Sequence, residues 1–160
     1  MFSLSLVSVP VMLDTNTETA VLLKQWVRLY HYGHLLMPGL AICTFLLYTF
    51  VVVQRRSSGT DAQWRRYALA AATTVTMIPF TLAIMVPTND TLFRLDRQTR
   101  VDGTKEVLVS GDVRALVVRW SWMHIARSCF PLLGAVLGVG ALAEDLTLPI
   151  MSQPSKQQAK

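Results

Sequence analysis

Three apolar segments, each about as long as a bilayer core is thick, constrain the fold of this chain more than any other feature. They cover residues 33–53, 67–87 and 125–143, and their only Asp, Glu, Lys, Arg or His side chains are His34 and Arg127. About 20 residues of α-helix cross the hydrocarbon core of a membrane. Charged residues make up 16% of the chain, against roughly 25% in soluble domains, and its mean hydropathy is +0.39. We therefore expect an all-α integral membrane protein that crosses the bilayer more than once.

A fourth apolar segment lies at the N-terminus, where residues 1–13 carry no charged side chain. It is too short to cross a bilayer as a straight helix, and it lacks the basic start and cleavage site of a signal peptide. We interpret it as the end of a first membrane helix, which either is shortened at its N-terminus or enters the bilayer without fully crossing it. Residues 1–143 are then expected to form one domain, a membrane four-helix bundle, and residues 144–160 a polar, disordered tail.

The polar sequence after the first segment predicts the start of another helix. Thr15 and Glu18 have the spacing of a capping box, and residues 20–32 have helix-compatible spacing. Trp26 and Tyr30 are amphipathic aromatic residues, which are enriched where a membrane meets water. The sequence therefore predicts a short interfacial helix that is separate from the span after it.

The net charge of +5 does not indicate a nucleic-acid-binding protein. The basic residues are spread over the polar connections instead of forming one stripe interleaved with aromatic residues. The partners we expect are membrane lipid and a small molecule, with no nucleic acid.

The last apolar segment begins beside three residues of one helix face. Trp120, His124 and Arg127 are spaced i, i+4 and i+7, so their side chains point the same way. An ionisable side chain at the edge of a membrane segment is costly unless it has a partner or a function. We therefore take His124 and Arg127 as candidate catalytic residues.

Further polar residues are expected at the same end of the bundle. His34 begins the second segment, and Asn89 and Asp90 follow the third. If the segments alternate in direction, the connections 14–32 and 88–123 lie on one side of the membrane, and three helix ends deliver polar groups to one pocket. A histidine there can act as a general base, an arginine can stabilise an oxyanion, and Asn or Asp can orient either group.

Each candidate also has a structural explanation. Asp90 can cap a helix, as can Asn89, or can form an ion pair with Arg127. Trp120 can anchor its helix at the membrane interface. His34 can be a hydrogen-bonded packing residue instead of a functional one.

A metal site is the main chemical alternative. His31 and His34 are spaced i, i+3, and His124 would add a third imidazole, enough with water for zinc or non-haem iron. No HExxH or other dedicated spacing supports it. Cys43 and Cys129 lie in different apolar segments without a CxxC pattern, so they are expected to be core residues. We therefore favour a site without metal.

Several short motifs, in the order of a whole domain, together resemble the fungal anthrone oxygenase family of small membrane proteins. They are Ser3-Leu4-Ser5-Leu6-Val7-Ser8-Val9-Pro10, Gln25-Trp26-x-x-x-Tyr30-x-x-Gly33-His34-x-x-x-Pro38, Pro79-Phe80-Thr81, Pro87-Thr88-Asn89-Asp90-Thr91-Leu92 and Trp120-x-x-x-His124-x-x-Arg127. The resemblance covers most of residues 1–143. It implies a four-helix membrane protein of an aromatic polyketide pathway, working beside other enzymes of that pathway.

The resemblance also implies a reaction, the oxidation of an emodin-anthrone-like substrate to the anthraquinone with dioxygen as co-substrate. The sequence has no nucleotide, flavin or haem motif, which fits an oxygenase without a cofactor. As a hypothesis, His124 or His34 removes a proton from the C10 methylene of the anthrone, and Arg127 with Asn89 stabilises the enolate oxygen. The aromatic residues Trp26, Tyr30 and Trp120 would form flat walls for the rings.

The alternative from another class is a non-catalytic membrane protein. In a scaffold or a small transporter-like subunit, His124, Arg127 and Asp90 would form an internal polar network. Conversion of an anthrone by membranes with and without the protein distinguishes the two hypotheses.

Overall fold

The computed structural model describes residues 2–57, 63–102 and 110–151, and within these residues it contains helices and no strand. The expected all-α fold is confirmed. With η for a π-helical turn, the elements in chain order are η1 (Leu4–Ser8), α1 (Val9–Thr15), α2 (Thr19–Ser57), α3 (Gln63–Val75), α4 (Met77–Phe80), η2 (Thr81–Met85), α5 (Val86–Asp102) and α6 (Ser110–Met151).

In the described part of the chain, three helical runs are long and apolar enough to cross a membrane, namely Thr19–Ser57, Gln63–Val101 and Asp112–Thr147. The apolar helix Leu4–Thr15 is shorter. Large apolar side chains such as Leu47 are exposed on the outside of these runs. A lipid environment accommodates such a surface, whereas water does not.

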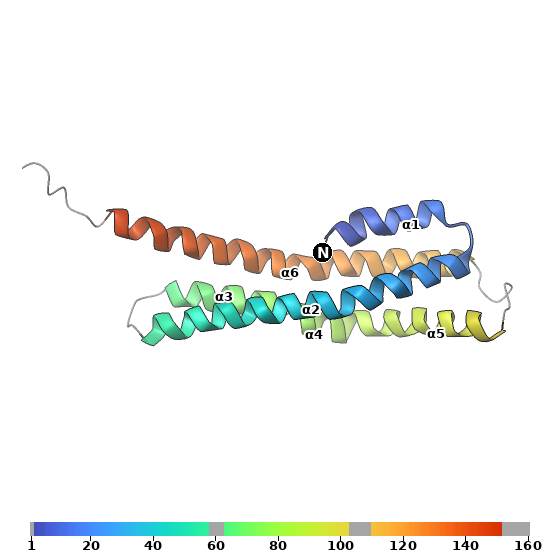
Figure 1. Ribbon diagram of the computed structural model, residues 1–160, viewed down its shortest axis with the longest axis horizontal. Helices are drawn as coiled ribbons and strands as arrows, with labels where there is room; N and C mark the ends of the chain where they lie inside the picture. Colours follow the sequence, from blue (N-terminus) through green and yellow to red (C-terminus); the bar gives the residue numbers. More distant parts are fainter. Residues whose placement is uncertain (1, 58–62, 103–109, 152–160) are drawn as a thin grey trace, which may run out of the picture.

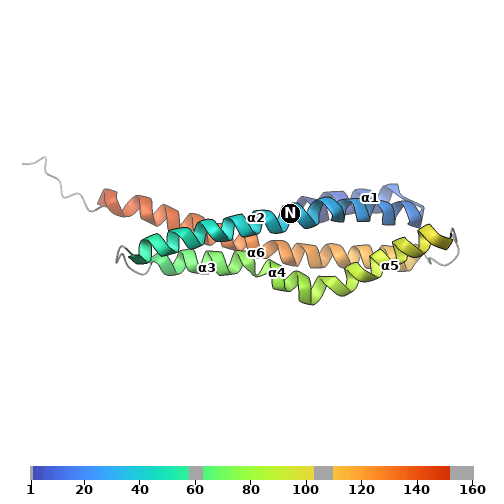
Figure 2. The same ribbon diagram turned by 60° about the horizontal axis from the view of Figure 1, so that its bottom comes forward.

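The helices pack as a bundle whose two halves differ (Figure 1). In one half α1, α2, α5 and α6 lie together, and in the other half α2 and α6 continue beside α3. Figure 2, turned by 60°, shows the same division, with the N-terminus beside the middle of the long helices. The bundle therefore has a junction near its middle, where η1 begins and the third helical run changes from α3 to α5.

The predicted interfacial helix does not exist as a separate element. Residues 20–32 and the next apolar segment form the single helix α2, with Pro38 inside it. The predicted capping box is also wrong, because the Thr15 hydroxyl donates to the Val11 carbonyl at 2.6 Å and so belongs to the end of α1. The helix continues from Tyr32 through Gly33, because a glycine inside a helix costs only about 1 kcal/mol relative to alanine.

Both π-helical turns lie directly before a Val-Pro pair. The Val9 amide donates to the Leu4 carbonyl, and the Val86 amide donates to the Thr81 carbonyl, each across five residues. Pro10 and Pro87 have no amide hydrogen with which to continue the ordinary i→i−4 ladder. Each proline therefore accounts for a widened turn just before it, and such turns often occur at functional sites.

The four-helix half is held by a buried apolar core to which all of its helices contribute. The aromatic rings of Trp26 and Trp120 meet edge to face there, with centroids 5.9 Å apart. The buried core residues are Val9, Leu22, Leu23, Trp26, Met85, Leu92, Val113, Val117 and Trp120.

The other half packs through small residues. Gly134 and Gly138 lie one turn apart on α6, and a Cβ added at Gly134 would collide with the Thr74 side chain and lie 3.0 Å from the Ala70 carbonyl oxygen of α3. A Cβ at Gly138 would collide with the Tyr48 ring of α2. This small-xxx-small pattern is a common way for membrane helices to approach closely.

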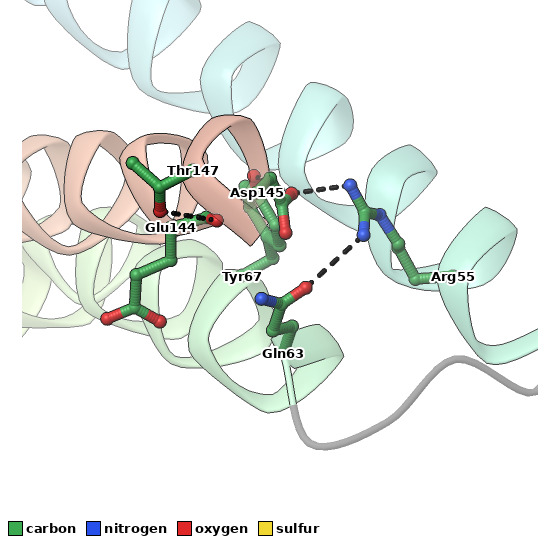
Figure 3. Close-up of polar contacts among 6 residues, drawn as sticks. All are labelled: Arg55, Gln63, Tyr67, Glu144, Asp145 and Thr147. Carbon is green, nitrogen blue, oxygen red and sulfur yellow. Dashed lines mark hydrogen bonds and ion pairs between the residues drawn. The ribbon is translucent and has the colours of Figure 1, made fainter. Parts of the chain in front are cut away.

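Polar contacts tie the three helices together at the end of this half (Figure 3). The Asp145 carboxylate accepts from the Arg55 guanidinium at 2.5 Å and from the Tyr67 hydroxyl at 2.9 Å. Glu144 forms an ion pair with Arg66. Residues 144–151, expected as part of a disordered tail, instead continue α6 because these carboxylates have partners on α2 and α3. Residues 152–160 lie outside the described residues.

The close approach of α6 to α3 predicts opposite effects for two glycines of one helix. Gly134→Ala should lower the free energy of unfolding by about 1–3 kcal/mol, because the added methyl group meets the Ala70 backbone. Gly140→Ala should leave stability unchanged or raise it, because no atom lies within 4 Å of its Cβ and alanine favours helix. Thermal unfolding of the purified protein in detergent measures both, and equal behaviour of the two variants would contradict the packing described.

Candidate active site

A pocket of about 160 Å³ lies at the junction of the two halves. It is formed by η1, α2, the η2–α5 region and α6, which brings together residues far apart in the sequence. Its lining residues are Leu4, Leu29, Tyr30, Gly33, His34, Pro38, Thr81, Met85, Asn89, Trp120, His124 and Arg127.

His124 is the most enclosed ionisable residue of this pocket, with 1% of its surface exposed. Its Nδ1 lies 3.0 Å from the hydroxyl oxygen of Ser5, which is itself buried. Its ring packs against Trp120, with centroids 5.0 Å apart. The imidazole is therefore fixed in position through one ring nitrogen, Nδ1.

Arg127 lies one turn further along α6 and is 8% exposed. Its Nη1 donates to the Thr81 hydroxyl at 3.4 Å, and its Nε has no hydrogen-bond partner. No carboxylate within the described part of the chain forms an ion pair with it. A buried guanidinium without a counter-ion is costly, so the pocket is suited to a ligand that carries or develops negative charge.

Asn89 reaches the pocket from α5 with 4% of its surface exposed. Its side-chain oxygen has no hydrogen-bond partner, and neither has Nε1 of Trp120. Together with the Nε atom of Arg127, three residues of the lining thus carry a buried polar atom that no described protein atom satisfies. Among the described residues, two other such atoms, Nε1 of Trp26 and Oδ1 of Asp145, lie outside the pocket. Buried polar groups are ordinarily paired, so the three in the pocket make it the candidate ligand site.

His34 and Tyr30 line the outer side of the pocket from α2. His34 is exposed, and its Nδ1 donates to the Tyr30 carbonyl oxygen at 3.1 Å. The two rings are stacked, with centroids 5.3 Å apart and planes 9° from parallel. Because His34 is both exposed and part of the lining, we place the mouth of the pocket there.

Two predicted site residues do not line this pocket. Trp26 is fully buried in the apolar core, where its ring packs against the rings of Tyr30 and Trp120. Asp90 is exposed and makes no ion pair with Arg127. Neither Asp90 nor Asn89 caps a helix, because α5 begins earlier, at Val86.

The three histidines do not assemble a metal site. His31 is exposed and does not line the pocket, while His34 and His124 lie on different helices. In residues 2–57, 63–102 and 110–151 there is no group of three His, Cys, Asp or Glu side chains arranged to hold a metal ion. Cys43 and Cys129 are free thiols, but the prediction that they are core residues is wrong, because Cys43 lies on the exposed side of α2 and Cys129 is only half-buried.

Sequence reasoning missed the hydroxyl partners of the site. Ser5 contacts His124 from η1, and Thr81 contacts Arg127 from η2. Both are short polar side chains in apolar runs, and both precede a Val-Pro pair by a few residues. That shared context is the signal that could have identified them.

A larger groove of about 560 Å³ lies nearby, between α1, α2 and α5. It shares only Leu29 with the pocket and contains neither His124 nor Arg127. Its remaining lining residues are Met12, Val21, Lys24, Gln25, Val27, Arg28, Tyr32 and Arg100. Since the buried polar groups all lie elsewhere, we assign the chemistry to the smaller pocket.

Comparison with known proteins identifies relatives over nearly the whole chain. The family model described as anthrone oxygenase matches residues 26–137. Anthrone oxygenase gedH of Aspergillus terreus is 47% identical over 91% of this chain and 91% of its own length. Anthrone oxygenase AgnL2 of Paecilomyces divaricatus is 49% identical over 86% of this chain and 83% of its own length. Anthrone oxygenase dmxR16 of Cryptosporiopsis sp. is 44% identical over 91% and 79%.

No solved structure matches the chain significantly. The family match spans the pocket residues of α2, η2, α5 and α6. The predicted resemblance is confirmed, and the chain belongs to the anthrone oxygenase family.

Proposed function

We propose that this protein is a multi-pass membrane oxygenase that converts a polyketide-derived anthrone to the anthraquinone with dioxygen. The observation that carries the proposal is the pairing of buried His124 with Arg127, a cation without a carboxylate partner, in one pocket. The curated relatives named above are anthrone oxygenases. An emodin-anthrone-like compound is the substrate we infer, from a pathway of secondary metabolism that other enzymes share.

The first chemical step is removal of a proton from C10 of the anthrone. The C10 methylene is acidic because its carbanion is delocalised through the rings to the C9 carbonyl oxygen. Nε2 of His124 accepts the proton, and the developing enolate oxygen accepts hydrogen bonds from the Arg127 guanidinium and from the side-chain NH2 group of Asn89. The same buried cation that is costly in the empty pocket is favourable once negative charge forms beside it.

Dioxygen then oxidises the enolate. The electron-rich anthranolate gives electrons to dioxygen, and a C10–O bond forms to give a peroxide anion. This anion takes the proton back from the His124 imidazolium and becomes a hydroperoxide. Loss of water from that hydroperoxide leaves one oxygen atom as the new C10 carbonyl and releases the other as water. Anthrone and dioxygen thus give anthraquinone and water, with no further oxidant or reductant, so we propose that no cofactor is required.

The size of the pocket determines how much of the substrate it encloses. At about 160 Å³ it is smaller than the roughly 300–1,000 Å³ of typical small-molecule sites. We infer that the central ring, which carries C10 and the C9 carbonyl on opposite edges, lies in the pocket between Tyr30 and Trp120. The part of the tricycle that the pocket does not enclose then lies at the mouth beside His34, at the lipid-facing surface of α2.

We assign the base to His124 in preference to His34. Both histidines have Nδ1 engaged, but His34 is exposed whereas His124 is enclosed beside Arg127. Proton transfer from carbon benefits from a fixed base in a site that excludes water. His34 is better placed to stack on the substrate at the mouth.

The non-catalytic alternative has less support from the same contacts. It needs an internal network in which Asp90 neutralises Arg127, but Asp90 is exposed and the pair does not form. An unpaired buried cation fits a binding or catalytic site better than a structural network.

Removal of the base should separate catalysis from folding. His124→Ala should lower the rate of anthrone oxidation by roughly 10²–10⁴-fold, toward the spontaneous background, because the reaction loses general base catalysis. Arg127→Gln should lower it by about 10²–10³-fold. His31→Ala is the matched control, since His31 is exposed outside the pocket, and should keep the wild-type rate. Quinone absorbance in purified membranes measures all three; undiminished turnover by a folded His124→Ala protein would rule out the assigned base.

Exhaustive chelation tests the absence of a metal requirement. The wild-type rate should stay the same after treatment with a strong chelator, because the proposed steps use only protein side chains and dioxygen. Metal analysis of the treated membranes verifies that the treatment worked. A reversible loss of activity that iron or zinc restores would replace the proposed mechanism with a metal-dependent one.

A further inference from the structure

The N-terminal π-helical turn is tied to the helix that carries His124 by two buried contacts. The Ser5 hydroxyl oxygen lies 3.0 Å from Nδ1 of His124, and the Ser121 hydroxyl donates to the Ser5 carbonyl at 3.3 Å. Ser5 is 4% exposed, Ser121 8% and His124 1%. Ser121 and His124, nearly one turn apart on α6, therefore both contact Ser5 of η1. Ser5 thus lies directly beside the proposed base.

The direction of the hydrogen bond between Ser5 and His124 decides whether His124 can act. A neutral imidazole has one protonated and one unprotonated nitrogen. If Nδ1–H donates to Ser5, then Nε2 is unprotonated and can accept a proton. If the hydroxyl donates to Nδ1, then Nε2 carries hydrogen and cannot act as a base.

The second π-helical turn shows how a hydroxyl in this setting is used. The Thr81 hydroxyl donates its hydrogen to the Met77 carbonyl at 2.7 Å, so its oxygen accepts from Nη1 of Arg127 at 3.4 Å. Ser5 also lies on a widened turn before a Val-Pro pair, with a pocket residue of α6 opposite its oxygen. An accepting hydroxyl at Ser5 would reproduce the arrangement of Thr81 and Arg127.

We propose that Ser5 is a positioning residue whose hydroxyl accepts the Nδ1 hydrogen of His124 and so fixes the tautomer with Nε2 free as the base. This inference rests on the proposed function of His124. The hydrogen bond made by one ring nitrogen generally sets the role of the other. Ser5 does not contact the substrate, and its effect on the reaction passes through the imidazole.

Nitrogen-15 NMR of the histidine side chains tests the tautomer directly in the full-length protein in detergent. The chain has three histidines, and His31→Gln and His34→Gln assign the signals by elimination. Wild-type His124 should show a protonated Nδ1 and an unprotonated Nε2. A protonated Nε2 in the neutral wild-type ring would overturn the proposal without the need for any variant at Ser5.

Variants at Ser5 test the catalytic consequence. Ser5→Ala should lower kcat by roughly 10–100-fold, the loss commonly seen when the hydrogen-bond partner that orients a metal-ligating histidine is removed, with KM unchanged and the fixed tautomer lost. Ser5→Thr keeps the hydroxyl and should restore both. The control is Ser8→Ala on the same turn, whose side chain is only half-buried, and it should match the wild type in spectrum and rate. A folded Ser5→Ala protein with wild-type tautomer and kcat would also overturn the proposal.

The outcomes distinguish this inference from the proposed function. If the wild type does not oxidise anthrones, the proposed function fails, and so does the comparison of kcat between Ser5 variants. The NMR signals still report whether Ser5 fixes the tautomer. If the wild type is active and Ser5→Ala is indistinguishable from it, only the role of Ser5 fails.

Discussion

The positive charge of Arg127, buried without a carboxylate partner among the described residues, is the constraint around which the pocket is arranged. A charge in this position costs free energy, which the folded bundle must supply. The two halves of the bundle supply this free energy differently. One half is stabilised by an apolar core centred on Trp26 and Trp120. The other is stabilised by the close approach of α6 to α3 at Gly134 and by ion pairs at its end. The pocket lies between these two stable regions.

Proline placement links this stability to the site. Each Val-Pro pair interrupts the regular hydrogen-bond ladder, and the widened turn before it carries a hydroxyl, Ser5 in η1 or Thr81 in η2. These hydroxyls meet His124 and Arg127, which lie one turn apart on a regular stretch of α6. The irregular turns η1 and η2 thus each place a hydroxyl against α6, a regular helix that carries the two proposed catalytic residues.

The bundle and the centre of the site could be predicted from the sequence because both follow from simple periodicities. Segment length gave the spans, and the i, i+4, i+7 spacing placed Trp120, His124 and Arg127 on one face. The sequence did not show which of the adjacent residues Asn89 and Asp90 belongs to the pocket. The two are turned about 100° apart on a helix, and only Asn89 faces inward. The roles of Ser5 and Asp145 depend on contacts across 119 and 90 residues, which no local pattern encodes.

Solvent exchange at C10 of an anthrone in the absence of oxygen tests the central claim most directly, because it isolates proton removal from oxidation. In deuterated buffer, the wild-type protein should incorporate deuterium at C10 well above the buffer rate, and His124→Ala should not exceed that rate. A wild-type protein that oxidises the anthrone in air but does not accelerate anaerobic exchange would contradict the account, since oxidation would then not begin with His124 removing a proton beside Arg127.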